Sequence, residues 1–308
     1  MLVATRDHRL QWNDLPDHVR ADIECALGSS VVEAVSRRGG YGPALASVCR
    51  LADDRRVFVK AVSPAQNPDS PVMMRREAEI NGCLPPEAPA PPLLHALDDD
   101  EWIALVFDFV EGELPATPWH PDELRRVITA TVALGDLVPR ASLHSVAAQY
   151  RAMFVGWRTL AAEPEAVDDV WCREHLDELV AAEASWEGAT AGNRLLHGDV
   201  RSDNVLLTPD ARVVFVDWTA TCTGAGWFDV LAMLPAVELE GGGPPEHVMG
   251  LVGLDLDRDE ILPLVAAMAG YFAERGTLPD PPGLPTVRAF QRAQGQVTTA
   301  WLRRLWES

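Results

Sequence analysis

The spacing of hydrophobic residues changes about one third of the way along the chain. Before that point, short apolar runs at residues 31–36, 45–51, 56–62 and 102–110 predict strands, and the turn sequences between the first three predict an antiparallel meander. Helical spacing at 15–27 and 71–84 predicts two helices among them. The proline-rich segment LPPEAPAPPLL, residues 84–94, predicts a break in all regular structure.

After residue 111 the apolar positions recur mostly at helical spacing. Helices are expected at 121–137, 142–160, 168–186, 227–239, 258–275 and 287–306, with two short strands around the turn TPDA between the third and the fourth. Strands followed by helices indicate an α+β fold with two lobes. We expect an N-lobe at residues 1–110 with a small antiparallel sheet and a mostly helical C-lobe at 111–308.

Composition and charge narrow the class of protein. A chain of 308 residues with 47% hydrophobic residues can bury a sizeable core, and its net charge of −20 disfavours nucleic acid and anionic membranes as partners. The charge allows a cationic small molecule as partner, although it equally suits a solvated surface. Five widely spaced cysteines, a charged N-terminus and no long apolar stretch favour a reduced, cytoplasmic protein.

Lys60 is the only lysine in the chain, and it lies in the third expected strand. Arginine replaces lysine on surfaces but not where a compact ammonium meets phosphate oxygens at one point. In the helix expected at 71–84, Glu77 falls on the same face as the apolar residues Met73, Ile80 and Leu84. A carboxylate that points inward needs a partner. Lys60 and Glu77 therefore form a candidate cation with its orienting carboxylate.

The segment RLLHGDVRSDNVLLTPDARVVFVDW, residues 194–218, contains four carboxylates between two strand-like runs. A solvated hairpin loop is one interpretation, and a phosphoryl-transfer site is the other. In the second, Asp199 accepts the proton of a hydroxyl group and Arg201 stabilises charge on the transferring phosphate. Asn204 and Asp217 would then hold magnesium ions. His197 is expected to shape the loop by hydrogen bonds.

The motifs HGDVRSDN and VDW resemble the aminoglycoside phosphotransferase and choline kinase family, which has the protein-kinase fold. The resemblance implies ATP or GTP as phosphate donor and Mg²⁺ as cofactor. It also implies that Asp229 supports the catalytic loop and that VFDFVEG is the hinge, where the backbone of Asp108 and Val110 contacts the purine in front of Phe107. Gly40 and Gly42 would cover the phosphates, although taken alone they are better explained by a glycine-rich hairpin turn.

Three functions remain open at this stage. The first is O-phosphorylation of an antibiotic, aminoglycoside-like or other, which gives resistance. The second is a kinase of primary metabolism acting on choline, methylthioribose, homoserine or a sugar, and the third is an inactive nucleotide-binding module. The partner is a hydroxyl-bearing small molecule, with neither nucleic acid nor membrane, and the chain is a monomer or homodimer. Acidic residues at 163–183 would attract a cationic acceptor, although most are expected to be solvated surface.

Overall fold

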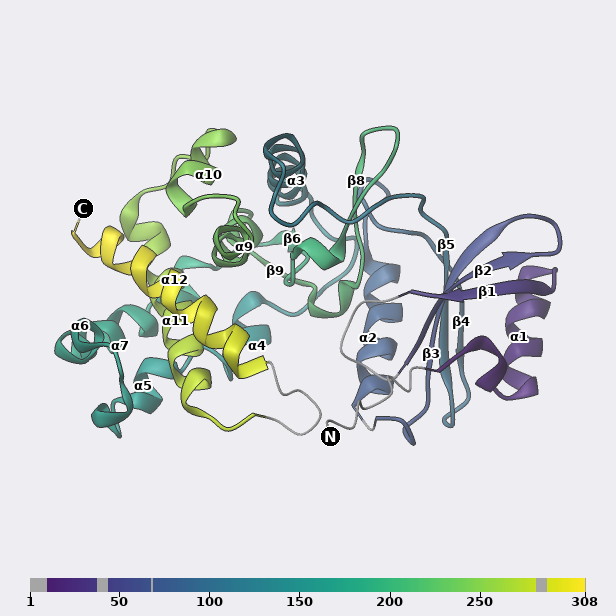
Figure 1. The fold of residues 1–308 in the computed structure, drawn as a ribbon, viewed down its shortest axis with the longest axis horizontal. Helices are drawn as coiled ribbons and strands as arrows, with labels where there is room; N and C mark the ends of the chain where they lie inside the picture. Colours follow the sequence, from purple (N-terminus) through teal and green to yellow (C-terminus); the bar gives the residue numbers. More distant parts are fainter. Residues whose placement is uncertain (1–9, 38–43, 68, 281–286, 308) are drawn as a thin grey trace, which may run out of the picture. The chain divides into compact units, whose positions relative to one another are not determined.

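The computed structural model describes residues 10–37, 44–67, 69–280 and 287–307, and these residues form two compact units (Figure 1). The sheet unit contains the residues up to Leu84, Pro89–Glu113 and Leu206–Thr219. The helical unit contains Pro85–Ala88, Leu114–Val205 and the residues from Ala220 onward. The division into lobes at residues 1–110 and 111–308 stays a prediction.

The sheet unit is built on five antiparallel strands in the order β1-β2-β3-β5-β4. They are β1 (Val31–Ser36), β2 (Leu45–Leu51), β3 (Arg56–Val62), β4 (Leu93–Asp98) and β5 (Ile103–Asp108). A 3₁₀ turn (Trp12–Asp14), α1 (Asp17–Leu27) and α2 (Ser70–Cys83) accompany them. The predicted meander of the first three strands is confirmed, residue for residue. A small second sheet pairs β7 (Val205–Leu207) with β8 (Val213–Phe215).

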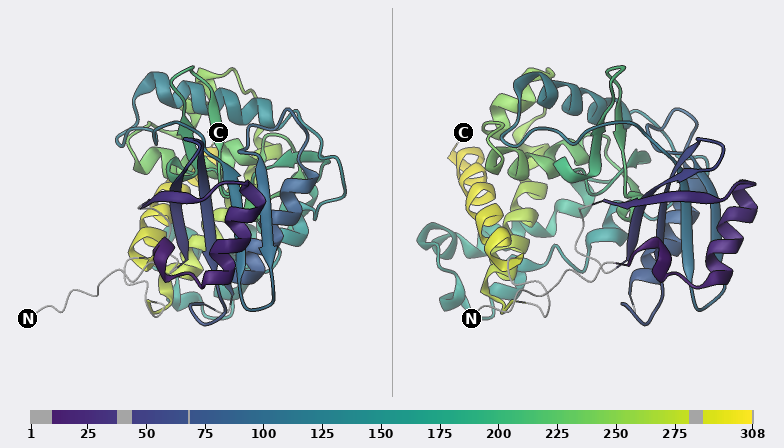
Figure 2. Two further views of the ribbon diagram at one scale, coloured as in Figure 1. Left: turned by 90° about the vertical axis from the view of Figure 1, so that its right-hand side faces the viewer. Right: turned by 45° about the vertical axis from the view of Figure 1, so that its right-hand side comes forward.

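The two helices cover opposite faces of the five-stranded sheet, and Figure 2 shows α1 in front of it in the left-hand view. Val57, Val59 and Ala61 of β3 pack with α1, whereas Val62 belongs to the cluster that contains Met74 of α2. Side chains alternate between the faces of a strand, so Lys60 lies on the α2 face. This alternation brings Lys60 and Glu77 to the same side of the sheet.

Two expectations about the sheet unit are wrong in detail. The proline-rich segment ends in β4, which begins directly after Pro92 and pairs with β5; because the prolines precede the strand, they remove no donor from its ladder. In α2, Met74 is buried and Met73 is 53% exposed, so the buried face contains Met74, Glu77 and Ile80. Glu77 still points inward, as predicted.

The helical unit contains α3 to α12 and the two-stranded sheet of β6 and β9. The helices are α3 (Pro121–Leu134), α4 (Val146–Tyr150), α5 (Gly156–Leu160), α6 (Val170–Glu174), α7 (Leu176–Ala184), α8 (Trp186–Ala189), α9 (Phe228–Leu239), α10 (Pro245–Leu251), α11 (Arg258–Thr277) and α12 (Val287–Glu307). The strands are β6 (Arg194–Leu196) and β9 (Cys222–Gly224), and 3₁₀ turns lie at Pro164–Ala166 and Ser202–Asn204. A further 3₁₀ turn, Trp218–Ala220, spans the boundary in sequence between the two units. Apart from α10, which was not expected, the helices after residue 220 follow the prediction closely.

Two long helices of the prediction are instead broken into short ones. The helix expected at 142–160 is divided into α4 and α5, and α5 approaches α11 so closely that a Cβ at Gly156 would lie 1.9 Å from the Gly270 carbonyl oxygen. The helix expected at 168–186 becomes α6, α7 and α8, because His175 leaves the helical region at φ −108°, ψ 20°. Of the resulting short helices, α5, α7 and α8 pack against α11.

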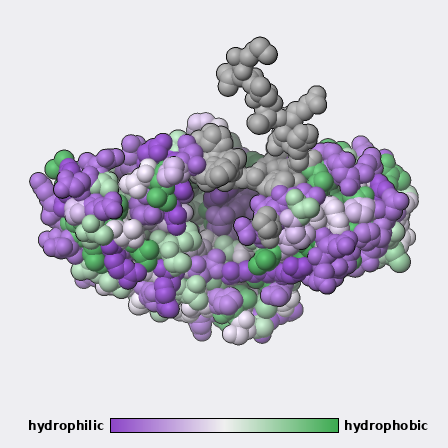
Figure 3. Space-filling view, turned by 90° about the horizontal axis from the view of Figure 1, so that it is seen from below, coloured by the Kyte–Doolittle hydropathy of each residue, from purple (hydrophilic) through white to green (hydrophobic). Residues whose placement is uncertain are grey.

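The surface of the molecule is mostly hydrophilic on the side seen from below (Figure 3). On the face shown in Figure 3, most residues are hydrophilic and the hydrophobic ones lie scattered among them. Single exposed apolar side chains such as Val72 are ordinary in folded proteins. Among the residues that the structure describes, no helix is long and apolar enough to cross a membrane.

Candidate functional site

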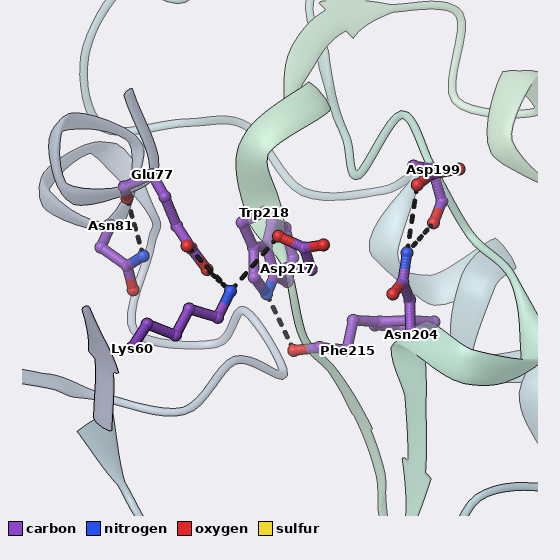
Figure 4. A network of polar contacts seen from close by, with 8 residues as sticks. All are labelled: Lys60, Glu77, Asn81, Asp199, Asn204, Phe215, Asp217 and Trp218. Carbon is purple, nitrogen blue, oxygen red and sulfur yellow. Dashed lines mark hydrogen bonds and ion pairs between the residues drawn. The ribbon is translucent and has the colours of Figure 1, made fainter. Parts of the chain in front are cut away.

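Lys60 and Glu77 form an ion pair in the sheet unit, in which Glu77 is buried and Lys60 is half-buried. Lys60 Nζ lies 2.7 Å from Oε1 and 2.9 Å from Oε2 of Glu77, whose side chain is only 3% exposed (Figure 4). Strand β3 and helix α2 supply the two residues. A lysine tail has four rotatable bonds, and this two-oxygen contact fixes its end in one position. The structure thus brings together the two residues that the sequence paired.

Asp217 is the second carboxylate beside this lysine. Its Oδ1 lies 3.3 Å from Lys60 Nζ, and its side chain is 46% exposed. The residue follows β8 in the left-handed backbone region, at φ 65°, which few residues other than glycine adopt. The next residue, Trp218, is buried and donates Nε1–H to the Phe215 carbonyl oxygen at 2.8 Å. This anchored turn holds the Asp217 carboxylate against Lys60 while leaving it accessible.

Burial and charge act in opposite directions on the Lys60 pKa. Burial lowers it, but the carboxylates of Glu77 and Asp217 together outweigh burial and raise the pKa above its usual range. The lysine is therefore a cation at neutral pH. Burial raises the pKa of Glu77, against the opposing charge of Lys60 and a hydrogen bond from the Trp218 backbone. One ammonium faces two carboxylates, and the accessible Asp217 can still bind a further cation.

The catalytic-loop motif lies in the helical unit, where Asp229 holds its backbone. Asp229 lies in the first turn of α9 and accepts the His197 N–H at 2.6 Å and the Gly198 N–H at 2.9 Å. The His197 ring is fully buried and its Nδ1 lies 3.3 Å from the Asp199 N–H, whose hydrogen bond it accepts. His197 therefore shapes the loop, as the sequence suggested.

Gly198 has a conformation and surroundings that suit only glycine. Its φ is +84°, and a Cβ atom would lie 2.3 Å from the Ala220 carbonyl oxygen. The Tyr150 hydroxyl donates a hydrogen bond to the Gly198 carbonyl oxygen. The glycine of the HGD motif thus lets the chain turn tightly and present Asp199.

Asn204 is buried and oriented by Asp199. Its Nδ2 donates to the Asp199 carbonyl oxygen at 2.9 Å and to Oδ2 at 3.2 Å, and Figure 4 shows its amide oxygen directed away from Asp199. The amide of Asn204 therefore has a fixed orientation, with oxygen available as a hard ligand. In the described part of the chain, no three His, Cys, Asp or Glu side chains cluster closely enough to hold a metal ion by themselves.

Arg201 pairs with Asp203, a carboxylate of the same segment for which the sequence suggested only an ordinary turn role. Its Nε and Nη2 lie 2.9 and 2.6 Å from the two oxygens of Asp203, and Nη1 lies 4.0 Å from Asp199 Oδ2. Asp203 therefore orients the guanidinium group beside the candidate base. This geometry is compatible with the expected charge-stabilising role of Arg201.

The pattern of residues is matched by a family model. Residues 42–260 match the model described as "Phosphotransferase enzyme family" (APH). The chain belongs to this family. It is thus a nucleotide-dependent phosphotransferase that acts on a hydroxyl group of a small molecule. The family and the type of enzyme that the sequence predicted are both confirmed. Among curated proteins, none has significant sequence similarity to the chain.

Solved structures share the fold at low sequence identity. A thermostable mutant of aminoglycoside phosphotransferase APH(4)-Ia, in a ternary complex with AMP-PNP and hygromycin B, has a TM-score of 0.57 and 14% identity, with 94% of this chain and 98% of that chain covered. An aminoglycoside phosphotransferase from Alicyclobacillus acidocaldarius has a TM-score of 0.53 and 16% identity, with 92% of this chain and 95% of that chain covered. The choline kinase LicA from Streptococcus pneumoniae has a TM-score of 0.51 and 10% identity, with 94% of this chain and 100% of that chain covered. The predicted kinase-like α+β fold is confirmed.

The segment expected to form the hinge lies among the described residues, whereas the glycines expected to cover the phosphates do not. Phe107 is buried in β5, and Lys60 Nζ lies 5.8 Å from its ring centre. The Asp108 N–H is donated to the Pro92 carbonyl oxygen at 2.9 Å, so the backbone of Asp108 can offer a purine only its carbonyl oxygen. Val110 is half-buried just beyond the strand. Gly40 and Gly42 lie outside the described residues.

Sequence reasoning about the phosphotransferase missed the residues that hold the catalytic loop from a distance. Tyr150 bonds Gly198 across 48 positions, and Glu240 bonds Ser202 across 38. Neither belongs to a motif with fixed spacing, so a single sequence carries no signal for them. Tyr150 is the last residue of α4, and its ring stacks on that of Phe154 with the ring centres 5.4 Å apart.

Proposed function

We propose that this phosphotransferase modifies a cationic, hydroxyl-bearing antibiotic of the aminoglycoside type and so inactivates it in the cytoplasm. The accessible carboxylate of Asp217 beside the Lys60–Glu77 pair is the observation that best supports the reaction. It combines a fixed cation for phosphate oxygens with a metal-binding carboxylate. The net charge of −20 supports a cationic acceptor.

In the proposed reaction each residue has one task. Lys60 binds the α- and β-phosphates, and Asn204 and Asp217 hold Mg²⁺, which when bound neutralises charge on the phosphates. Hard oxygen ligands suit Mg²⁺, which usually combines one or two carboxylates with phosphate oxygens. Asp199 accepts the proton of the acceptor hydroxyl as its oxygen bonds to the γ-phosphorus and the bond to the β–γ bridging oxygen breaks. Arg201 stabilises the transferring charge.

Acidic residues between 163 and 183 divide into two groups that bear on the acceptor. Six are exposed: Glu163, Glu165, Asp168, Glu174, Asp177 and Glu178. The other two have structural partners, since Asp169 pairs with Arg303 and buried Glu183 accepts the Trp157 and Arg158 N–H groups. The exposed group can raise the local concentration of a polycation.

A kinase of primary metabolism is the second candidate, and the structural likeness to a choline kinase favours it. Choline is also a cation with one hydroxyl group, so charge alone does not separate the two. The test is incubation of the purified enzyme with Mg²⁺, ATP or GTP, and a panel of aminoglycosides, other antibiotics, choline, methylthioribose, homoserine and sugars. We expect one aminoglycoside-like compound to gain the mass of one phosphoryl group at the highest kcat/KM. Phosphorylation of choline or a neutral metabolite alone would overturn the antibiotic assignment.

A further inference from the structure

Helix α9 has a carboxylate in contact with the catalytic loop at each of its ends. Asp229, in the first turn, accepts the His197 and Gly198 N–H groups. Glu240, the residue directly after the last helical residue Leu239, accepts the Ser202 hydroxyl at 2.8 Å. The loop is therefore held before and after Asp199 by one helix.

Glu240 is itself fixed by a buried tryptophan. Trp119 is 6% exposed and donates Nε1–H to Glu240 Oε2 at 2.9 Å, while Oε1 accepts the Ser202 hydroxyl. The Trp119 backbone N–H also bonds the Glu240 carbonyl oxygen at 3.0 Å. Each carboxylate oxygen thus has a different partner, and the side chain has little freedom left to turn.

Ser202 connects this anchor to the residues proposed for chemistry. It begins the 3₁₀ turn Ser202–Asn204, and the Asn204 N–H bonds the Arg201 carbonyl oxygen at 3.0 Å. The Asn204 amide in turn holds Asp199. A shift of Ser202 would therefore displace the amide oxygen of Asn204 and the carboxylate of Asp199 together.

The dimensions of helix and loop agree. Asp229 and Glu240 are eleven helical steps apart, which gives a rise of about 16 Å. Gly198 and Ser202 are four steps apart and reach at most about 14 Å when extended. The side chains of Asp229 and Glu240 cover the remaining difference in length, so the two ends of α9 can hold the two ends of the loop at a fixed distance from each other. A single anchor at Asp229 would leave the 3₁₀ turn free to move.

We propose that Glu240 is a positioning residue for phosphoryl transfer, acting through Ser202 on Asn204 and Asp199. The proposal rests on the proposed roles of these two residues. It predicts an effect on turnover and on the magnesium requirement. Acceptor binding should be unaffected, because Glu240 acts on the loop through Ser202.

A double-mutant cycle tests this coupling. Glu240→Ala and Ser202→Ala should each lower kcat about 10- to 100-fold and raise the magnesium concentration for half-maximal rate, with the acceptor KM nearly unchanged. The double variant should lose little more than the worse single variant, because each change already breaks the Glu240–Ser202 contact. Glu238→Gln, in the same helix but beside Arg304, is the matched control and should keep the parent rate. The proposal would be overturned if the kcat losses of the two single variants multiplied in the double variant, or if only the acceptor KM changed.

Hydrogen exchange makes the test independent of turnover. In the nucleotide-free protein, both single variants should speed exchange at the Asn204 amide and its neighbours, while α11 and α12 keep their protection. Unchanged protection in the loop would refute the positioning role even if the enzyme were found to phosphorylate no compound of the panel. Faster exchange in a protein that transfers no phosphoryl group would refute the proposed function but support the conclusion that Glu240 holds the loop through Ser202.

Discussion

Lys60 Nζ lies within 3 Å of both carboxylate oxygens of Glu77, at 2.7 and 2.9 Å, although 17 residues separate the two in sequence. The contact joins the single lysine of the chain to an almost fully buried glutamate. A lone ion pair in such a position costs desolvation and is seldom kept for stability alone. The pair therefore indicates a site that must present one ammonium group at a defined point.

Replacing Lys60 by arginine should remove most of the activity. The exchange conserves charge, but the wide planar guanidinium cannot occupy the place of a compact ammonium between Glu77 and Asp217. We expect kcat/KM for the nucleotide to fall at least about 100-fold, measured with saturating acceptor. Arg50→Lys, an exchange on the exposed side of β2, is the control and should be nearly neutral. A fully active Lys60→Arg enzyme would show that the lone lysine is an accident of composition.

Glu183 should contribute to stability and leave chemistry intact. It is buried and accepts the Trp157 and Arg158 N–H groups at 2.9 and 3.1 Å, at the start of α5. Glu183→Ala leaves both donors without this acceptor, so the free energy of unfolding should fall by about 2–3 kcal/mol. The exposed Glu178→Ala should change it by less than about 0.5 kcal/mol. Denaturant unfolding compares the two variants, and equal losses would contradict the structural role.

Asp229 should make stability depend on pH in a defined direction. Burial raises its pKa to about 6, against the opposing hydrogen bonds from Gly198 and His197. An unfolded aspartate titrates near pH ~3.9. Between these values the folded protein holds a proton that the unfolded chain has lost, so stability falls as pH rises. The unfolding free energy of the parent minus that of Asp229→Asn should drop by about 1.5 kcal/mol from about pH 4.5 to about pH 6. A difference that rises or stays constant would show that the pKa is not raised.

How much could be predicted from the sequence depended on how local the determining contacts are. Strands β1 to β3, Lys60 with inward Glu77, and the HGD and VDW motifs are set by alternation and short spacings, and these were predicted. Of the broken helices, α5, α7 and α8 pack against α11, and the Glu240–Ser202 bond joins residues 38 positions apart. Such contacts follow from the folded arrangement and leave no periodic trace in one sequence.

The affinity for a cationic acceptor should depend on salt more strongly than the affinity for nucleotide. The exposed carboxylates between 163 and 178 would act through solvent, where salt screens charges beyond about 10 Å. The acceptor KM should climb as salt rises to about 0.5 M, whereas the nucleotide KM, set by direct contacts, should climb much less. Replacing Glu174, Asp177 and Glu178 by glutamine should weaken the dependence of the acceptor KM on salt concentration. An acceptor KM indifferent to salt would leave these residues as ordinary surface.

The most direct test of the account compares Asp199→Ala with Asp217→Ala by nucleotide binding and single turnover on the acceptor found in the panel. Asp199→Ala should bind Mg²⁺–nucleotide nearly as tightly as the parent and turn over about 10²–10⁴-fold more slowly, the usual range for a lost general base. Asp217→Ala should lose the magnesium-dependent part of nucleotide binding, because it removes the accessible carboxylate beside Lys60. Parent-like turnover in Asp199→Ala, or unchanged magnesium-dependent binding in Asp217→Ala, would contradict the assignment of base and metal ligand.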